Sequence, residues 1–270
     1  MSANASLLAI ARSIAVEAAH LARQRRQDRV EIAASKSSPE DVVTAADREV
    51  EQLVRRRLAD ARPDDGFLGE ESGGGGGTSG LTWVVDQIDG TVNYLYGIPS
   101  YAVSIAVVEG EADPATWTAL AGAVVNGASG ETYTASRGGG AARDGVALRV
   151  APPASLSLAL VGTGFGYDAA RRRRQGAVVQ ELLGSVRDIR RIGSAALDLC
   201  AVASGQLNAY YEKGLNPWDL AAGALIAEEA GARVAGLSGR PATSELLIAA
   251  PEPLFGELEE LLASLHADQV

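Results

Sequence analysis

Two aspartates that could do chemistry stand three residues apart at the end of an apolar run. The run, Leu81 to Val85, predicts a strand, so Asp86 lies where that strand ends. Asp89 comes three residues later, and Gly90 makes the turn there sterically easy. A helix beginning at Thr91 would add free N–H groups and the positive end of its dipole. This arrangement could bind a cation and a phosphate side by side, although the same residues also suit a hairpin turn and a simple cap.

Two further acidic segments could join these aspartates. Adjacent carboxylates, Glu70 and Glu71, follow a short apolar pair. Much later, Asp219 lies between Pro217, a good first-turn residue, and an apolar helical run. Asp219 could merely stabilise the helix dipole, which is worth about 0.3–1 kcal/mol. As a metal ligand it would instead complete the set of oxygen ligands that Mg²⁺ prefers.

Taken together, these segments resemble the inositol monophosphatase family, in family order from about residue 36 to residue 250. The stretch from Arg190 to Leu199 is especially similar to actinobacterial members. The matching motifs are Asp86-x-Ile88-Asp89-Gly90-Thr91, Gly69-Glu70-Glu71-Ser72, Trp218-Asp219-x-Ala221-Ala222-Gly223, Lys36 with Asp41 to Asp47, Gly193-Ser194-Ala195-Ala196 and Tyr210-Tyr211-Glu212.

The resemblance implies an α+β fold, a layered α-β-α-β-α sandwich of the inositol monophosphatase and fructose-1,6-bisphosphatase type. It also implies a homodimer that hydrolyses small phosphate monoesters with two or three Mg²⁺ per subunit. By position, Glu70, Asp86 and the carbonyl of Ile88 would hold one metal ion. Asp86, Asp89 and Asp219 would hold the second, and Glu70 would help to hold a weaker third.

The resemblance also assigns catalytic and substrate contacts. Glu70 and Thr91 would orient the attacking water, and Asp47 would hold the Thr91 hydroxyl. The N–H groups of Gly90 and Thr91 would bind phosphate oxygens. Metal ions would activate the water and neutralise charge on the transferring phosphoryl group. The residues expected to contact the substrate are Gly193, Ser194, Ala195, Glu212 and Asp219.

The leading prediction is an Mg²⁺-dependent phosphomonoesterase that converts inositol 1-phosphate to myo-inositol and is inhibited by Li⁺. Glu212, placed to meet a polyol, favours this substrate. Fructose-1,6-bisphosphatase, histidinol-phosphatase and 3′-phosphoadenosine-5′-phosphate phosphatase activities remain alternatives on the same fold. A non-enzymatic regulator that binds a protein partner is a further alternative, which the intact set of acidic residues disfavours.

One residue departs from the family pattern. Gln87 occupies the position between Asp86 and Ile88 where family members usually carry proline. Proline would fix φ and remove a donor, so glutamine predicts a less rigid metal-binding turn. We therefore expect the replacement Gln87→Pro to raise magnesium affinity.

Residues 1–270 are expected to form one domain with two closely packed halves, about 1–150 and 151–270. Elements come in blocks rather than in strict alternation, which favours layered packing. The glycine-rich residues 73–80 predict a flexible loop without regular structure. Helices are predicted over 5–27, 44–61, 169–183, 194–204, 217–230 and 253–265. Strands are predicted over 81–85, 102–108, 121–125, 131–135, 147–150, 158–162, 232–235 and 245–249.

The composition predicts a cytoplasmic protein with neither nucleic-acid nor membrane partners. The net charge of −10 argues against nonspecific binding of nucleic acid, and the basic cluster 171–174 is interpreted as a solvated turn or helix start. The single cysteine, Cys200, excludes an intramolecular disulfide and fits a reducing compartment. Glu17 and His20 interrupt the N-terminal apolar stretch, so no signal-peptide layout or membrane span is predicted.

Overall fold

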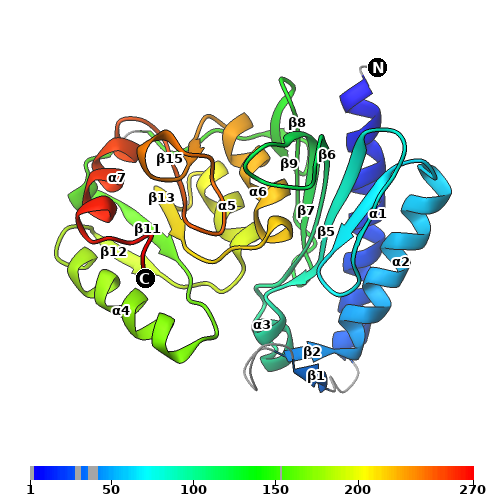
Figure 1. Cartoon of the computed structure of the whole chain (residues 1–270), viewed down its shortest axis with the longest axis horizontal. Helices are drawn as coiled ribbons and strands as arrows, with labels where there is room; N and C mark the ends of the chain where they lie inside the picture. Colours follow the sequence, from blue (N-terminus) through cyan, green and yellow to red (C-terminus); the bar gives the residue numbers. More distant parts are fainter. Residues whose placement is uncertain (1–2, 28–31, 36–41, 153) are drawn as a thin grey trace.

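Five layers of alternating helices and sheets make up the molecule (Figure 1). The computed structural model describes residues 3–27, 32–35, 42–152 and 154–270. One outer layer holds α1 and α2, the middle layer holds α5 and α6, and the other outer layer holds α4 and α7. The helices are α1 Ala3–Gln27, α2 Ala45–Ala61, α3 Thr91–Tyr96, α4 Ala169–Leu182, α5 Ala195–Ala203, α6 Pro217–Glu229 and α7 Leu254–Ser264.

The sheet between the α1–α2 layer and the middle layer has eight strands in the order β10-β9-β8-β7-β6-β5-β3-β4. Its neighbouring strands are antiparallel except for the parallel pair β3 and β5. The strands are β3 Gly66–Gly69, β4 Gly73–Gly75, β5 Leu81–Asp89, β6 Ala102–Glu109, β7 Thr118–Asn126, β8 Thr132–Ser136, β9 Gly140–Arg143 and β10 Val146–Ala147.

The second sheet has five strands in the order β12-β11-β13-β15-β14. Its first three strands are parallel, and β15 is antiparallel to both of its neighbours. The strands are β11 Leu160–Thr163, β12 Asp188–Arg190, β13 Ala209–Glu212, β14 Arg233–Ala235 and β15 Leu247–Ala250. A separate two-stranded sheet pairs β1 (Ile32–Ser35) with β2 (Val42–Thr44), and short 3-10 turns cover Leu156–Leu158 and Leu237–Gly239.

Four apolar cores fill the four spaces between these layers. One joins α1 and α2 to the large sheet, and a second joins the opposite face of that sheet to α5 and α6. The third joins α5 and α6 to the small sheet, whose other face packs against α4 and α7. Both sheets are therefore covered on both faces, as the layered α+β prediction requires. This arrangement confirms the predicted fold class.

The spacing of apolar residues in α1 explains why this helix packs as an outer layer against the large sheet. Its buried positions, such as Leu7, Ala11, Ile14 and Ala18, recur every three or four residues and face the sheet. In length and composition α1 also resembles a helix that could cross a membrane. Here its apolar face packs into the protein core, which accounts for that composition.

Local signals also fix the start of α2. Thr44 caps the helix and forms a reciprocal capping box with Asp47, as the spacing predicts. The Asp47 backbone N–H donates to Thr44 Oγ1 at 3.3 Å, and Thr44 N donates to Asp47 Oδ2 at 2.7 Å. Two groups at the helix end that would otherwise lack partners are thereby satisfied.

The glycine run departs from its prediction as an irregular loop. Gly73–Gly75 form β4, which pairs with β3, and Gly77 approaches the neighbouring backbone so closely that a Cβ there would lie 2.3 Å from Gly66 N. Gly77 lies just after β4, and glycine permits this close approach because it brings no side chain into the contact. The strand expected over 147–150 is also shorter, since β10 ends at Ala147. Lys36 and Asp41 of the family motif lie outside the described residues.

Candidate metal centre

Asp86 and Asp89 both lie on β5, and an irregularity in that strand brings them together. In a regular strand, residues three apart point to opposite faces. The pairing of β5 with β6 shifts register between Asp86 and Asp89, which lets both side chains reach one cavity. The two residues are 2% and 9% exposed, respectively. The Asp86 carboxylate also accepts a hydrogen bond from the Ile88 backbone N–H at 3.2 Å.

The third carboxylate comes from the first turn of α6 in the middle layer. Pro217 begins this helix, and Asp219 Oδ2 accepts a hydrogen bond from the backbone N–H of Asn216 at 2.6 Å. One oxygen each from Asp86, Asp89 and Asp219 lie within 4.8 Å of one another. The structure therefore brings together three of the four predicted carboxylate ligands as a group that could hold a metal ion.

Glu70, the fourth predicted carboxylate ligand, lies just beyond the end of β3 and lines the same cavity. Its Oε2 accepts a hydrogen bond from Gln87 Nε2 at 3.1 Å. Gln87 is fully buried, so this amide is part of the interior beside the cavity. The sequence indicates only how Gln87 affects the backbone, and nothing in it shows that this side chain would hold a proposed ligand. We call Glu70, Asp86, Asp89 and Asp219 the carboxylate cluster.

Asp89 is anchored by the start of α5. Its Oδ2 accepts hydrogen bonds from Ser194 Oγ at 2.6 Å and from the Ala196 backbone N–H at 2.8 Å. Ser194 also caps α5, because its Oγ accepts from the Leu197 N–H. The Ser194 hydroxyl is thus already engaged with Asp89, although Gly193, Ser194 and Ala195 all line the cavity as predicted.

The electrostatics of the carboxylate cluster fit a hard divalent cation. Burial raises the pKa of Asp86 well above its usual range, and the neighbouring carboxylates raise it further. Burial likewise raises the pKa of Asp219 and raises the pKa of Asp89 to about 6, against the hydrogen bonds from Ser194 and Ala196. Within the described part of the chain, no arginine or lysine forms an ion pair with these aspartates. Clustered oxygens of this kind suit Mg²⁺.

A helix does begin at Thr91, directly after the two aspartates of β5. Gly90 precedes α3 with φ of 90°, in the left-handed region. A Cβ on Gly90 would lie 3.0 Å from the carbonyl oxygens of Gly193 and Ser100, so the position requires glycine. Gly90, Thr91 and Ile88 all line the cavity.

Asp47 is placed differently from its predicted role. The Thr91 hydroxyl donates to the Ile88 carbonyl at 3.1 Å, rather than to Asp47. Asp47 Oδ2 accepts from Thr44, while the buried Oδ1 has no hydrogen-bond partner among the described residues. One oxygen of this carboxylate therefore serves the cap of α2, and burial raises the pKa of Asp47 to about 6. No described hydrogen bond joins Asp47 to Thr91.

The cavity, of about 540 Å³, extends from the carboxylate cluster to the ends of β11 and β13. Glu212 lies there as predicted, and its carboxylate accepts a hydrogen bond from the Tyr210 hydroxyl. Burial raises the pKa of Glu212 to about 7. Sequence reasoning missed several other lining residues, because only folding brings their segments to this cavity: Phe165, Tyr167, Asp168, Arg171, Arg191 and Lys213.

Known proteins match this chain along nearly its whole length. Residues 3–269 match the inositol monophosphatase family. The chain belongs to that family. Mycobacterium tuberculosis inositol-1-monophosphatase SuhB is 46% identical, over 97% of this chain and 94% of its own. Because its carboxylates converge in one cavity and its relatives are inositol-1-monophosphatases, this inositol monophosphatase family member is a phosphomonoesterase.

A solved structure and a second relative extend the comparison. The structure of Mycobacterium tuberculosis SuhB superposes with a TM-score of 0.81 and 42% identity, and covers 98% of each chain. A Pseudomonas aeruginosa relative described as Nus factor SuhB is 39% identical over 77% of each chain. The family resemblance predicted from the sequence motifs is confirmed.

Proposed function

We propose that this inositol monophosphatase family member hydrolyses inositol 1-phosphate, or a closely similar polyol monophosphate, with Mg²⁺. The observation that carries the proposal is the convergence of two buried aspartates, Asp86 and Asp89, and the half-buried Asp219 at one end of the cavity, with one carboxylate oxygen from each lying within 4.8 Å of the others. Glu212 lines the same cavity and offers an acceptor to a polyol hydroxyl. The name of the mycobacterial relative, inositol-1-monophosphatase, supports the same substrate.

The proposed roles of the metal ligands follow from their placement. Asp86, Asp89 and Asp219 would hold one cation, and Asp86 with Glu70 and the Ile88 carbonyl would hold another. When bound, Mg²⁺ supplies Lewis acidity that neutralises phosphoryl charge and makes water a better nucleophile. Two ions, with a weaker third beside Glu70, remain the proposed number.

Other residues would position the phosphate, the water and the polyol. The N–H groups of Gly90 and Thr91 would bind phosphate oxygens at the start of α3, where donors lack helical partners. Glu70 and Thr91 would orient the attacking water. Asp47 supports α2 through Oδ2, which accepts from Thr44. Its buried Oδ1 is the oxygen that would hold the Thr91 hydroxyl in the predicted role.

Phosphate release from a panel of substrates tests this proposal. Inositol 1-phosphate, fructose 1,6-bisphosphate, histidinol phosphate and 3′-phosphoadenosine 5′-phosphate should be compared with and without Mg²⁺. The expected result is Mg²⁺-dependent release, with inositol 1-phosphate among the best substrates. Turnover that persists in a metal chelator would contradict the metal-dependent mechanism, and strong preference for another compound would reassign the substrate.

A regulatory role is a second candidate, because the Pseudomonas relative is described as a Nus factor. The carboxylate cluster is retained here, and a protein that acted only by binding a partner would not need it. Full phosphatase activity in the purified chain would show that catalysis persists whatever partners it has. Absence of activity on the whole panel would favour the regulatory role.

The remaining proposals concern the state of the protein. We propose a cytoplasmic homodimer whose activity Li⁺ inhibits by competing for the second metal position. Light scattering on the purified protein tests the dimer, and inhibition that weakens as Mg²⁺ rises tests the competition.

A further inference from the structure

Glu212, the residue proposed to meet the polyol, is bonded to a tyrosine of its own strand. Residues two apart on a strand point to the same face, so Tyr210 and Glu212 of β13 share the face toward the middle layer, and Tyr211 points to the opposite face. The Tyr210 hydroxyl donates to Glu212 Oε2. Among the described residues, no other hydrogen bond reaches the Glu212 carboxylate.

The hydroxyl of Tyr210 has a fixed position because its ring is tightly packed. Tyr210 is fully buried in the core that joins α5 and α6 to the small sheet. Its partner on β11 is Gly162, and a Cβ on this glycine would lie 3.1 Å from Tyr210 Cδ2. The ring therefore lies close against the backbone of the neighbouring strand, and the surrounding packing restricts its rotamer.

The chemistry of the two groups favours a hydrogen bond from the phenol to the carboxylate. Burial raises the pKa of Tyr210 well above its usual range, so the phenol keeps its proton near neutral pH. Burial raises the pKa of Glu212 to about 7, and the hydrogen bond from Tyr210 opposes this rise because it favours the ionised form. The Tyr210 hydroxyl therefore helps to keep Glu212 a hydrogen-bond acceptor.

A glycine leaves room for the Glu212 carboxylate at the cavity wall. Gly164 directly follows β11, the strand parallel to β13, and a Cβ on Gly164 would overlap the carboxylate of Glu212. Both residues line the cavity that holds the carboxylate cluster. The carboxylate thus lies against the Gly164 backbone with Oε2 bonded to Tyr210, which leaves Oε1 for a ligand.

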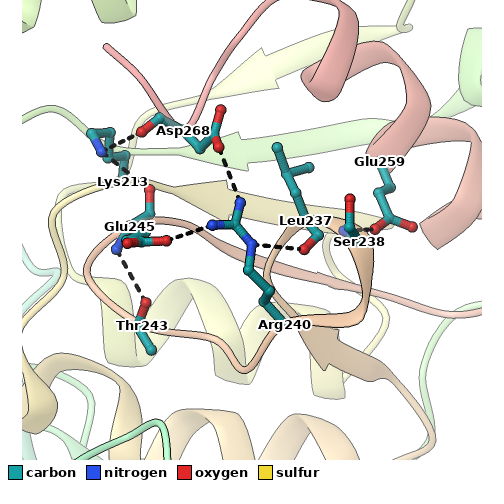
Figure 2. A network of polar contacts seen from close by, with 8 residues as sticks. All are labelled: Lys213, Leu237, Ser238, Arg240, Thr243, Glu245, Glu259 and Asp268. Carbon is teal, nitrogen blue, oxygen red and sulfur yellow. Dashed lines mark hydrogen bonds and ion pairs between the residues drawn. The ribbon is translucent and has the colours of Figure 1, made fainter.

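The end of β13 is anchored separately, by other parts of the chain. Lys213 Nζ donates to the backbone oxygens of Asp268 at 2.6 Å and Glu245 at 3.3 Å (Figure 2). The Lys213 carbonyl also accepts a hydrogen bond from Gln175 Nε2 at 3.3 Å. Loss of the Tyr210 hydroxyl is therefore expected to free one side chain and not the strand.

We propose that Tyr210 is a positioning residue that makes the site selective for alcohols rich in hydroxyl groups. Its hydroxyl holds Glu212 Oε2, so that Oε1 accepts a hydrogen bond from a hydroxyl in the alcohol part of the substrate. The inference rests on the proposed phosphatase function, which places the phosphate at the carboxylate cluster. A carboxylate that is held in advance loses less conformational freedom on binding, and hydrogen bonds to ionised acceptors are among the stronger ones.

Steady-state kinetics with two substrates test this role. Inositol 1-phosphate has hydroxyl groups in its alcohol part, whereas 4-nitrophenyl phosphate has none. With Mg²⁺, Tyr210→Phe is expected to raise KM for inositol 1-phosphate about five- to tenfold, because it removes the hydroxyl that holds Glu212. The kcat for inositol 1-phosphate and both constants for 4-nitrophenyl phosphate should stay nearly unchanged. Equal changes for both substrates, no change in either, or a loss in kcat alone would overturn the role.

Tyr211→Phe is the matched control, because it removes the same group from the next residue of β13. Tyr211 faces the core that contains α4 and α7, and it does not line the cavity of the carboxylate cluster. Both substrates should keep their kinetic constants in this variant. Losses equal to those in Tyr210→Phe would show that loss of either phenol disturbs the strand, which would overturn the specific role.

A double-mutant cycle shows whether Tyr210 acts through Glu212. Glu212→Ala should itself raise KM for inositol 1-phosphate, since it removes the acceptor. Adding Tyr210→Phe to Glu212→Ala should raise that KM by less than about twofold, because the group that Tyr210 holds is already gone. Effects that multiply in full would mean that the two residues act independently, and would overturn the positioning role.

Failure of the proposed function can be told apart from failure of this role. If neither compound releases phosphate, the phosphatase proposal is wrong, and calorimetric binding of inositol 1-phosphate in Mg²⁺ then decides the role of Tyr210. Weaker binding in Tyr210→Phe, with binding unchanged in Tyr211→Phe, supports it. Equal binding in all three proteins, or none in wild type, overturns it. Phosphate release from 4-nitrophenyl phosphate alone would retain the phosphatase and overturn the selectivity.

Discussion

The carboxylate cluster and two arginines, Arg171 and Arg191, line one cavity, but their surroundings differ. Asp89 is buried and fixed by Ser194 and the start of α5, whereas Arg191 is exposed and has no described side-chain hydrogen bond. Burial of like charges is unfavourable unless a counter-ion is supplied, so the cluster is suited to cations. Solvent screens the exposed charge of Arg191, which therefore needs no counter-ion of this kind.

Removing a ligand from the carboxylate cluster should have the largest effect. Asp89→Asn is expected to lower kcat by about 100- to 1,000-fold, because a carboxylate that would hold charge-stabilising metal is lost. Phosphate release at saturating Mg²⁺ measures the change. The exposed Asp60→Asn on α2 is the matched control and should be neutral. Full turnover in Asp89→Asn would refute the metal mechanism.

The second-largest loss of activity is expected from a change at the start of α3, because this helix begins directly beside the carboxylate cluster. Thr91→Val should lower kcat by about 10- to 100-fold, since it deletes the hydroxyl proposed to orient water. The hydroxyl now donates to Ile88 O at 3.1 Å, and Thr91→Ser keeps that group. Serine should therefore retain most of the activity. Equal losses in the valine and serine variants would point to packing rather than to the hydroxyl.

The charge state of the cluster predicts a pH-dependent response to Mg²⁺. Burial raises the pKa of Asp89 to about 6, so its protonated form favours the folded state. That stabilising contribution is complete below the ordinary pKa near 4 and is lost as pH rises through 6. Because a metal ligand must be deprotonated, added Mg²⁺ should raise the melting temperature by about 5 °C more at pH 8 than at pH 5.

Thermal melts with and without Mg²⁺ measure this response. Asp89→Asn should reduce the difference between the two pH values, because it removes one titrating ligand. A Mg²⁺ effect that is the same at pH 5 and pH 8 would argue that the cluster is already charged at pH 5.

The smallest expected effect concerns Gln87, which supports the cluster through its side chain. Gln87→Leu should weaken Mg²⁺ binding by about 2- to 10-fold, since it removes one hydrogen bond to Glu70 and leaves the backbone free as before. Calorimetric titration of Mg²⁺ provides the measurement.

Gln87→Pro separates this contact from backbone stiffness. It removes the same amide and also fixes φ, so tighter binding than in wild type would show that rigidity outweighs the hydrogen bond. Binding no tighter than that of Gln87→Leu would show that the amide contact is the larger effect, against the expectation drawn from the sequence.

Elements with strong local signals were predicted within a few residues. The helix expected over 217–230 is α6, Pro217–Glu229, where proline suits the first turn. The helix expected over 169–183 is α4, Ala169–Leu182. By contrast, β12 and β13 were not predicted. They are only three and four residues long, and the neighbours that pair with them, rather than their own sequence, make them strands.

Much of the candidate site could also be predicted, because the acidic motifs contain the proposed metal ligands. The motifs do not show which atoms each side chain contacts. The spacing of Thr44 and Asp47 predicts the cap of α2, but it does not show that this local bond engages one oxygen of the carboxylate expected at Thr91. The amide of Gln87 was considered only as a missing proline, since nothing in the sequence shows that it reaches Glu70.

The candidate ligands and the family that they resemble can be identified from the sequence alone. Residue types, spacing and helix-start signals are local properties, so they can be recognised along the chain. Tertiary packing adds the register shift that turns Asp86 and Asp89 to one side, and the position of α6 that brings Asp219 to meet them. It also turned Arg171, expected to be a solvated arginine, into part of the cavity wall. Such contacts depend on how the layers pack, and no short stretch of sequence contains that information.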